Sequence, residues 1–400
     1  MTTATAPPRL FGDDHAAHPE HAHEALRRQG PVAWAEISPG VYALVVTTHR
    51  AARDLLIDTH TWSKDSRGWL ALAAGEIPQD SPVLALMAYR PSLLYADGPA
   101  HARLRRAMDD CIETIDVHLL RETTQRHATA LIASLAPGGH ADLMAAYADR
   151  LPLLVFTDLL GCSADMVARM VTASQGVIGA GPGALAAARE FAACLADLIS
   201  AKKQRPGHDI TSWMLAHPAA LTDEEMLHQL YCLVGAGVIP TAAWIGSTVH
   251  LLLSDDGYTA QLAGGTVTIR RAMETVLWTR SPMATFSTHF ARLDTVLHGV
   301  PVAAGVPVMI SHALTGTDPT LAGLGTDNRA HLAWSAGPHR CPADTTATVI
   351  AQTAVECLLD QLWGPRLNDG AVVNRPGPFH SCPAALHIRF QPNPAGGTSP

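Results

Sequence analysis

The segment from 222 to about 254 is patterned as one helix of more than 30 residues, and it constrains the fold more than any other part of the sequence. It opens with "LTDEE", in which Thr222 and Glu225 have the spacing of a capping box. Its middle, "VGAGVIPTAAW", contains two glycines and Pro240, which are costly in a helix interior. The pattern alone leaves two interpretations open: a break that gives two helices, or a core helix that opens where a ligand or cofactor passes.

The rest of the chain is patterned mainly as helices, with short strands near the start and late in the sequence. Two β-like runs, "VAWAEI" and "VYALVVTT", are separated by Pro39-Gly40 and predict a hairpin. A third β-like region, "DTVLHGVPVAAGVPVMISH", carries Gly and Pro turn signals. Helical periods occur in "HARLRRAMDDCIE", "LRETTQRHATALIASLA", "MAAYADRLPLLVFTDLLG", "LAAAREFAACLADLISAKK" and "DTTATVIAQTAVECLLDQLW". The last places five apolar residues on one stripe, as on a buried helix face: Ile350, Ala354, Cys357, Leu358 and Leu362.

Composition and charge argue against several classes of protein. The 400 residues are 48% hydrophobic and 16% charged, which is enough to bury a substantial core. A net charge of -8 and a pI near 6.2 argue against a nucleic-acid binder, which needs a basic face. We expect no signal peptide and no membrane span, because neither pattern of apolar residues is found. The seven cysteines are scattered and odd in number, so six of them predict buried thiols of a reduced, cytoplasmic protein.

The seventh cysteine, Cys341, lies in "HLAWSAGPHRCPADTT", where it can be a structural thiol, a nucleophile, a zinc ligand or an iron ligand. By residue type alone a structural thiol is the default, and zinc lacks four ligands in paired spacing. Gly337, Pro338 and Pro342 predict a tight loop rather than a core strand. A helix follows at once, and its N-terminal N–H groups favour a thiolate. A thiolate in such a loop suits an axial ligand of haem iron.

At this loop the sequence resembles the cytochrome P-450 family. "AWSAGPHRCPA" is similar to the family's cysteine-loop signature, with Trp334, Gly337, His339 and Cys341 in matching places. Further segments match in order along nearly the whole chain: "GPVAWAEI…VYALVVTTHRAARDLL", "YADGPAHARLRRAM", "RPGHDITSWML" and "GVPVAAGVPVMISHALTGTDP". The resemblance implies a mainly α fold with small β-sheets, a triangular helical prism with haem between the long central helix and the cysteine-loop helix.

The resemblance also implies one cytochrome P-450 domain over residues 1–400. Such a domain binds haem b and receives electrons from NAD(P)H through redox partners. Its expected parts are a β-rich N-terminal part over about 30–65, a helical core over about 100–290, the late β-hairpin and cysteine loop over about 291–345, and a C-terminal helix with a substrate-side loop over about 346–392.

For the haem, the resemblance assigns five residues. Cys341 would be the axial ligand and therefore the metal-binding residue. His101 and Arg105, at i and i+4 on one helical face, would bind the propionates together with His339 of the cysteine loop. His289 stands where the family usually has an arginine after the late helix. Without the resemblance, His101 and Arg105 would be interpreted as a solvated helix face.

The sequence departs from the family at its usual Glu-x-x-Arg pair. In "METVLWTRSPM", alignment on Pro282 places Thr275 at the Glu position and Trp278 at the Arg position, with Glu274 one residue early. Exchange of a buried charge pair for an aromatic residue is neutral or stabilising when the aromatic residue packs well. We interpret the change as a variant of actinomycete type and not as a loss of function.

A second departure lies in the long helix, where the family pattern Ala-Gly-x-Asp/Glu-Thr-Thr becomes "AGVIPT". The acid position holds Ile239 and the alcohol position holds Pro240, so the pair that relays protons for O–O cleavage is absent. Thr241, ordered water or a polar substrate group are the alternative proton sources. We expect Ala236, Gly237 and Thr241 to be the catalytic residues of this helix, and the glycines and Pro240 to form a kink over the haem.

By resemblance, the substrate pocket is walled by the loop from "WSKDSRGW" to "LLYAD", by the central helix, and by segments after Pro282 and around 379–383. Ordinary core or loop packing is the alternative explanation for each candidate residue. Because the candidates are mostly apolar and aromatic, they would suit a planar, weakly polar ligand. They are Trp69, Met87, Tyr89, Ile239, Ala284 and Cys382, with Ala236 beside them.

These features predict a haem-thiolate oxidase of bacterial specialised metabolism that uses O2 to oxidise an aromatic natural-product intermediate. The expected reaction is oxidative radical coupling, through C–C or C–N bonds, of tryptophan-containing cyclic dipeptides, because the sequence resembles enzymes that couple such compounds. One alternative is a regioselective monooxygenase that hydroxylates or epoxidises a small apolar substrate. Another is a non-catalytic haem-binding protein.

The expected partners are a ferredoxin and a ferredoxin reductase, together with the small aromatic substrate. A small acidic ferredoxin would dock near the cysteine face, where Arg103, Arg106 and Arg340 add positive charge. We further expect a monomer in the cytoplasm that binds neither nucleic acid nor a membrane.

Overall fold

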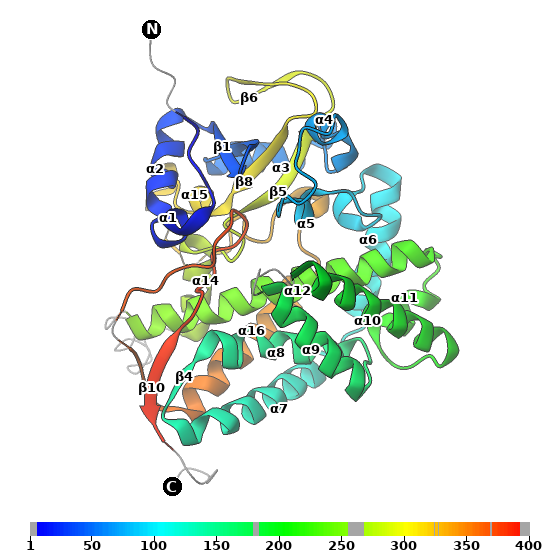
Figure 1. Cartoon of the computed structure of the whole chain (residues 1–400), viewed down its shortest axis with the longest axis vertical. Coiled ribbons are helices and arrows are strands. Elements are labelled where there is room, and N and C mark those ends of the chain that lie inside the picture. Colours follow the sequence, from blue (N-terminus) through cyan, green and yellow to red (C-terminus); the bar gives the residue numbers. More distant parts are fainter. Residues whose placement is uncertain are drawn as a thin grey trace.

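The segment patterned as one long helix forms a single continuous helix, α12 (Asp223–Ser254). The predicted capping box is present: the N–H of Thr222 donates to Glu225 Oε2 at 2.9 Å, and the N–H of Glu225 donates to Thr222 Oγ1 at 3.2 Å. The helix continues through Pro240, so the interpretation of a break into two helices is wrong. The structure is a computed structural model that describes residues 6–178, 184–254, 268–323, 325–326, 328–368 and 370–392 (Figure 1).

Helices from both halves of the chain pack around α12. α8, α10, α14 and α16 contact it directly, as does a π-helical turn where the sequence predicted ordinary helix. Their side chains form one hydrophobic cluster, and all five residues of the predicted apolar stripe on α16 are buried. The elements of this helical part are α6 (Gly98–Glu113), α7 (Val117–Leu135), η3 (Ala136–Gly138), η4 (the π turn, Met144–Ala148), α8 (Arg150–Leu159), α9 (Ala164–Ile178), α10 (Ala184–Gln204), α11 (Ile210–Ala216), α14 (Ile269–Thr279) and α16 (Asp344–Gln361).

In length and composition, α12 alone among the helices of the described residues would suit a membrane span. However, 67% of its most apolar window is buried inside the protein, as in the core helix of a soluble protein. The absence of a membrane span therefore stays a prediction of the sequence. The single domain over 1–400 also stays a prediction.

A five-stranded sheet occupies the other end of the molecule, with α1 and α2 beside it (Figure 1). The strand order is β1-β2-β8-β5-β3, with β2 and β8 parallel and the other pairs antiparallel. The predicted hairpin is confirmed, because β1 pairs with β2 from Val32 opposite Val46 onward. The elements here are α1 (Gly12–Ala17), α2 (Pro19–Gln29), β1 (Val32–Ser38), β2 (Val41–Val46), α3 (His49–Ile57), β3 (Trp62–Ser63), η1 (Ser66–Gly68), α4 (Leu70–Ala73), α5 (Leu84–Met87), η2 (Leu93–Tyr95), β5 (Thr285–Ala291), β8 (Pro307–Ser311), α15 (His312–Gly316), η5 (Pro319–Leu321) and η6 (Gly337–His339).

Two smaller sheets complete the described part of the fold. The late β-like region forms the hairpin β6 (Thr295–Leu297) and β7 (Val300–Val302) before it enters β8, as the turn signals predicted. A three-stranded sheet joins β4 (His140–Asp142), β10 (His387–Gln391) and β9 (Trp363–Leu367) in the order β4-β10-β9. The sequence analysis missed this sheet, because "WGPRL" in β9 contains Gly and Pro and shows no strand pattern.

A buried pair links α14 to the segment that enters the cysteine loop, at the position where the family's usual charge pair is missing. His331 Nε2 lies 3.0 Å from Glu274 Oε2, and both side chains are buried. The Trp278 ring meets the His331 ring edge to face at 5.6 Å between centroids, and Trp278 Nε1–H donates to the carbonyl of Asn328 at 2.9 Å. Glu274, one residue early in sequence, therefore pairs with the buried His331 through Oε2, while its Oε1 lies 3.7 Å from Nε of the more exposed Arg329.

We expect Glu274→Ala to lower the free energy of unfolding by about 1–3 kcal/mol, because it leaves the buried His331 Nε2–H without an acceptor. Glu274→Gln retains an acceptor oxygen, so it should cost less than the alanine variant. Urea unfolding at equal haem loading measures both. Glu24→Ala, which removes an exposed partner of Arg28, is the control, and a Glu274→Ala midpoint equal to that of the control would contradict the role of the pair.

Candidate active site

Cys341 is held in a loop between η6 and the start of α16. Its N–H donates to the carbonyl of Trp334 at 2.8 Å, which closes the loop across the stretch "AWSAGPHRC". Gly337 has a φ of +65°, and a Cβ there would lie 2.5 Å from the carbonyl oxygen of Leu56 in α3. Glycine is therefore required at this position by both the backbone conformation and the close approach of α3.

The surroundings of Cys341 act on its thiol in opposite directions. Burial raises the pKa of Cys341, and a hydrogen bond from the N–H of Ala343 at the start of α16 opposes that rise. Arg105 and Arg340 also lower this pKa, whereas Asp344 raises it. The predicted effect of the helix N-terminus is thus present but smaller than that of burial. A bound metal ion would remove the thiol proton outright.

One face of α12 turns toward Cys341 and stays accessible although most of the helix is buried. Cys232, Ala236 and Ile239 share this face at i, i+4 and i+7, and Ala236 is exposed at mid-helix. A Cβ added at Gly235 would meet no atom within 4 Å. Burial raises the pKa of Cys232 to about 11, and the nearby Cys341 adds to the rise. The accessible face of α12 therefore includes Cys232, which lies close enough to the cysteine loop for Cys341 to influence its pKa.

The residues expected to be catalytic have different surroundings on α12. Thr241 is buried, one residue after Pro240. A Cβ at Gly237 would lie 2.1 Å from the ring of Phe156 in α8, so packing against α8 is enough to require glycine there. Pro240 has no N–H, so the carbonyl of Ala236 lacks its α-helical donor on the accessible face.

Two of the histidines assigned to the propionates lie together at one edge of the cysteine loop. The rings of His101 (α6) and His339 (η6) are 4.0 Å apart between centroids. Their His101 Nε2 and His339 Nδ1 atoms are buried and have no hydrogen-bond partner in the protein. Arg105 donates from Nη1 to the carbonyls of Pro338 at 2.9 Å and Arg340 at 2.6 Å, so it holds the loop itself.

His289 (β5) belongs to the same group of imidazoles. Its Nδ1 lies 2.6 Å from the carbonyl of Ser287, and the side chain is buried. Burial and the positive charge of Lys64 lower the pKa of His289 well below its usual value and that of His339 to about 2. The edge of the site therefore presents neutral imidazoles around one lysine that the sequence analysis did not single out.

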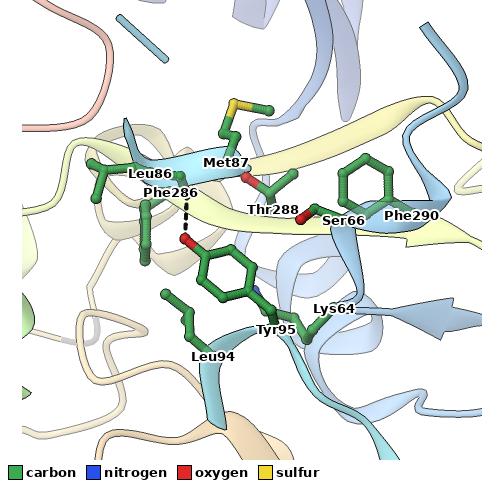
Figure 2. Close-up of a pocket in the computed structure, with 9 residues that line it drawn as sticks. All are labelled: Lys64, Ser66, Leu86, Met87, Leu94, Tyr95, Phe286, Thr288 and Phe290. Atoms are coloured by element: carbon green, nitrogen blue, oxygen red, sulfur yellow. Dashed lines mark hydrogen bonds between the residues drawn. The ribbon is translucent and has the colours of Figure 1, made fainter. Parts of the chain in front are cut away.

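A narrow cavity opens between β5 and the chain from β3 to η2 (Figure 2). Three aromatic, three aliphatic and three polar residues form its wall. Tyr95 lies at its centre, with its hydroxyl donating to the carbonyl of Leu86 at 3.1 Å. Met87 is the predicted pocket residue that lines it. The sequence analysis did not name the others, which come from short elements without a clear period: Lys64, Ser66, Leu86, Leu94, Tyr95, Phe286, Thr288 and Phe290.

The remaining predicted pocket residues are dispersed. Trp69 is buried beside Phe290, with 6.4 Å between ring centroids. Tyr89 is partly exposed, and the guanidinium of Arg67 lies 4.3 Å from its ring centroid. Ala284 lines a separate cavity near α1 and α2, and Cys382 is fully buried in the hydrophobic cluster of the helical part. The structure brings Met87, Trp69 and Tyr89 near one cavity, since the Tyr89 ring lies 6.4 Å from the ring of Tyr95, and leaves Ala284 and Cys382 apart from it.

Two of the three arginines predicted to attract a ferredoxin are paired with carboxylates. Arg103 forms an ion pair with Glu225 of α12. Arg340 Nη2 lies 2.6 Å from Asp344 Oδ2. Arg106 is exposed on α6. The positive charge of this face is therefore weaker than the sequence alone suggested.

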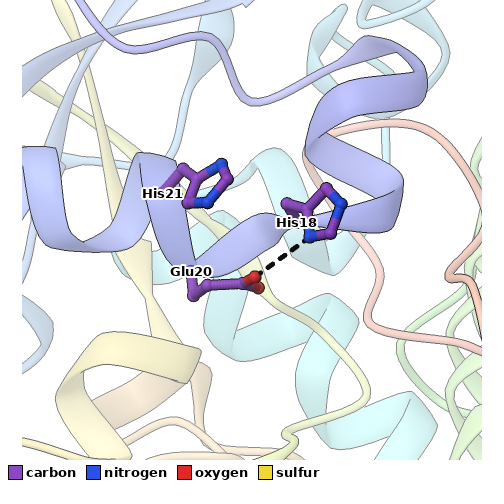
Figure 3. Close-up of side chains that lie close together, drawn as sticks. All are labelled: His18, Glu20 and His21. Carbon is purple, nitrogen blue, oxygen red and sulfur yellow. Dashed lines mark hydrogen bonds and ion pairs between the residues drawn. The ribbon is translucent and has the colours of Figure 1, made fainter. Parts of the chain in front are cut away.

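A second group of side chains that could bind a metal ion lies far from Cys341 in sequence, where α1 meets α2 (Figure 3). His18, Glu20 and His21 are the one group of three such residues within the described residues whose ligand atoms all lie within 4.8 Å. His18 Nδ1 is 3.2 Å from Glu20 Oε1. All three side chains are exposed, so the surroundings do not fix them as a preformed site.

No protein-family model matches the chain. Among curated proteins it is 30% identical to cytochrome P450-SU2 of Streptomyces griseolus, over 98% of this chain and 99% of that protein. It is 29% identical to the cytochrome P450 monooxygenase PikC of Streptomyces venezuelae, over 97% and 96%. Among solved structures, CYP154C4 from Streptomyces sp. W2061 superposes with a TM-score of 0.86 at 26% identity, over 96% and 98% of the two chains.

The similarity covers the fold and the cysteine loop together. The helical part, the small sheets and the loop around Cys341 all lie within the matched length. Members of the family use haem b, receive electrons from NAD(P)H through redox partners, and act as monooxygenases on small substrates. The chain belongs to the cytochrome P-450 family.

Proposed function

We propose that the protein is a haem-thiolate oxidase of specialised metabolism in which Cys341 is the axial ligand of the haem iron. The observation that carries the proposal is the accessible mid-section of α12, one turn of which carries Cys232 close enough to Cys341 to influence its pKa. In a helix that is otherwise mostly buried, an exposed Ala236 on the same face as Cys232 supports a site that a flat cofactor would fill.

The residues at the edge of this space suit the carboxylates of haem b. His101 Nε2 and His339 Nδ1 are buried without a protein partner, and buried polar atoms are normally paired. His101, His339 and His289 would receive the propionates, while Arg105 orients the loop that carries Cys341. Haem b, when bound, supplies the activation of O2 for oxidation of the substrate.

We propose an aromatic natural-product intermediate as the substrate, with coupling of tryptophan-containing cyclic dipeptides as the reaction. The wall beside β5 supports an aromatic ligand, because the rings of Phe286, Phe290 and Tyr95 gather there with the aliphatic side chains of Leu86, Met87 and Leu94. The apolar Ile239 and Pro240 on α12 cannot pass protons. Thr241, ordered water or a polar group of the substrate would supply them.

Hydroxylation or epoxidation of a small apolar substrate is the second candidate. It is supported by the similarity to PikC, which is named as a monooxygenase and shares 29% identity with this chain over nearly its whole length. For either reaction we propose a ferredoxin and its reductase as electron donors, with docking near Arg106 on the cysteine side. A monomer in the cytoplasm remains part of the proposal.

The ligand assignment predicts a thiolate-type Soret band for the reduced protein with carbon monoxide. Cys341→Ala should lose that band, because the variant lacks the sulfur proposed to bind the iron. Cys357→Ala, which removes a buried thiol of α16, is the matched control and should retain it. A thiolate-type band that persists in Cys341→Ala would contradict the assignment.

The reaction predicts the mass of the product. With a ferredoxin system and a tryptophan-containing cyclic dipeptide, we expect a product of twice the substrate mass less two hydrogens, detected by mass spectrometry. A product heavier by one oxygen would instead support the monooxygenase alternative. No turnover with a panel of aromatic precursors, together with an intact Soret band, would favour a non-catalytic haem protein.

The role of Thr241 is tested by the yield of product per NAD(P)H consumed. Thr241→Val removes the hydroxyl at constant shape, and we expect the yield to fall by roughly 100-fold, the lower end of the range for general acid–base catalysis. Thr241→Ser keeps the hydroxyl and should stay near the wild-type yield. An unchanged yield in Thr241→Val would show that water or the substrate supplies the protons.

A further inference from the structure

Lys64 is a buried cation without an ion-pair partner among the described residues. The chain has only three lysines, and the other two are paired: Lys202 with Asp209 at 2.6 Å and Lys203 with Asp223 at 2.5 Å. Lys64 follows the short strand β3, and its side chain is 6% exposed. A buried ammonium without a counter-charge is costly, so its persistence in a fold indicates a partner that arrives with a ligand.

The one carboxylate close enough to influence Lys64 is already engaged. Asp97 Oδ1 accepts the backbone N–H of Lys64 at 3.1 Å, and Asp97 Oδ2 accepts the hydroxyl of Ser63 at 2.5 Å. The Oδ2 atom also accepts Arg292 Nη2 at 3.1 Å. Burial accordingly lowers the pKa of Lys64 to about 7, and Asp97 compensates only in part. The nearby negative charge therefore does not fully offset the cost of burying the ammonium of Lys64.

The ammonium lies at the haem edge of the site and not at the outer surface. Its charge acts on the imidazoles of His289 and His339, and His339 is two residues from Cys341. Figure 2 shows Lys64 behind Tyr95, on the wall of the cavity beside β5. Arg105, the other cation at this edge, is already engaged with Asp109 and with the carbonyls of the cysteine loop.

We propose that Lys64 binds a propionate carboxylate of the haem and supplies the positive charge that His289 does not provide at the family's usual arginine position. The inference rests on the proposed function, since it requires haem in the space between α12 and the cysteine loop. A carboxylate there would satisfy the ammonium of Lys64 and accept a hydrogen bond from the unpartnered Nδ1 of His339, on which the charge of Lys64 acts.

The test uses the purified holoprotein and two readouts that do not depend on activity. The first is the rate at which haem transfers to excess apomyoglobin, and the second is the resonance Raman band of propionate bending. Lys64→Met keeps the length of the side chain and removes its charge. We expect haem to leave this variant about 10- to 100-fold faster than the wild type, as expected for loss of one charge-assisted hydrogen bond, and the propionate band to shift.

Two further variants separate charge from packing. Lys64→Arg retains the charge. Its haem-transfer rate and propionate band should therefore be closer to those of the wild type than the values of Lys64→Met are. A purely structural role of the lysine would not predict this difference between the two variants. Lys203→Met removes a charge from the surface of α10 and should change neither readout. Should Lys64→Met not fold, Lys64→Gln gives the same comparison with a polar, uncharged side chain.

A second comparison tests whether the carboxylate that Lys64 binds is a haem propionate. Protein reconstituted with hemin dimethyl ester, whose propionates carry no charge, should lose its haem at the same rate with and without Lys64→Met. Equal acceleration for hemin and its ester would overturn the inference, because it would mean that Lys64 supports the fold and not the carboxylate. An unchanged rate and an unchanged band for hemin in Lys64→Met would also overturn it.

The carbon monoxide spectrum of the same samples separates this inference from the proposed function. A wild-type sample without the thiolate-type band would overturn the role of Cys341, while the haem-transfer rates would still test Lys64. A normal band together with wild-type haem retention in Lys64→Met would overturn the inference and leave Cys341 as the ligand.

Discussion

A helix as long and as apolar as α12 needs partners on nearly every side, and the fold is arranged to provide them. Helices from both halves of the chain cover it, and the remaining accessible face, around Ala236, looks toward the cysteine loop. The position of the loop depends in turn on α3, whose carbonyl at Leu56 leaves room for no side chain at position 337. The candidate site is therefore set by two elements: the mid-section of α12, which stays accessible at Ala236, and the loop that carries Cys341.

The charges that the family places around this site are redistributed here. The buried Glu274–His331 pair and the ring of Trp278 join α14 to the entry of the cysteine loop. At the haem edge, imidazoles and one lysine stand where an arginine is usual. A neutral imidazole costs less to bury than a guanidinium, but it gives less attraction to a carboxylate. The nearby buried Lys64 supplies positive charge in place of the arginine, and so offsets the weaker attraction of the imidazoles to a carboxylate.

Local patterns predicted the parts of the fold in which neighbouring residues decide the structure. The capping box at Thr222, the Pro-Gly hairpin and the cysteine loop all follow from adjacent residues and are present. The burial of Lys64 and the partner of Glu274 could not be predicted, because the residues that surround these two side chains are distant in sequence and meet only in the folded chain. His331 is 57 residues from Glu274, and no periodicity links them. β9 was missed for a related reason, since its Gly and Pro are tolerated only because β10 pairs with it.

Pro240 links the two departures from the family pattern on α12. It replaces an alcohol, which removes a proton donor, and it also deprives the carbonyl of Ala236 of its helical N–H. That carbonyl belongs to the exposed residue on the face turned toward Cys341, so the site exchanges a donor for an acceptor. Within the proposed function, a backbone acceptor on this face favours a substrate that can donate an N–H group to it. The proposed indole or cyclic-dipeptide amide carries such a group, whereas a plain hydrocarbon would leave the acceptor unsatisfied.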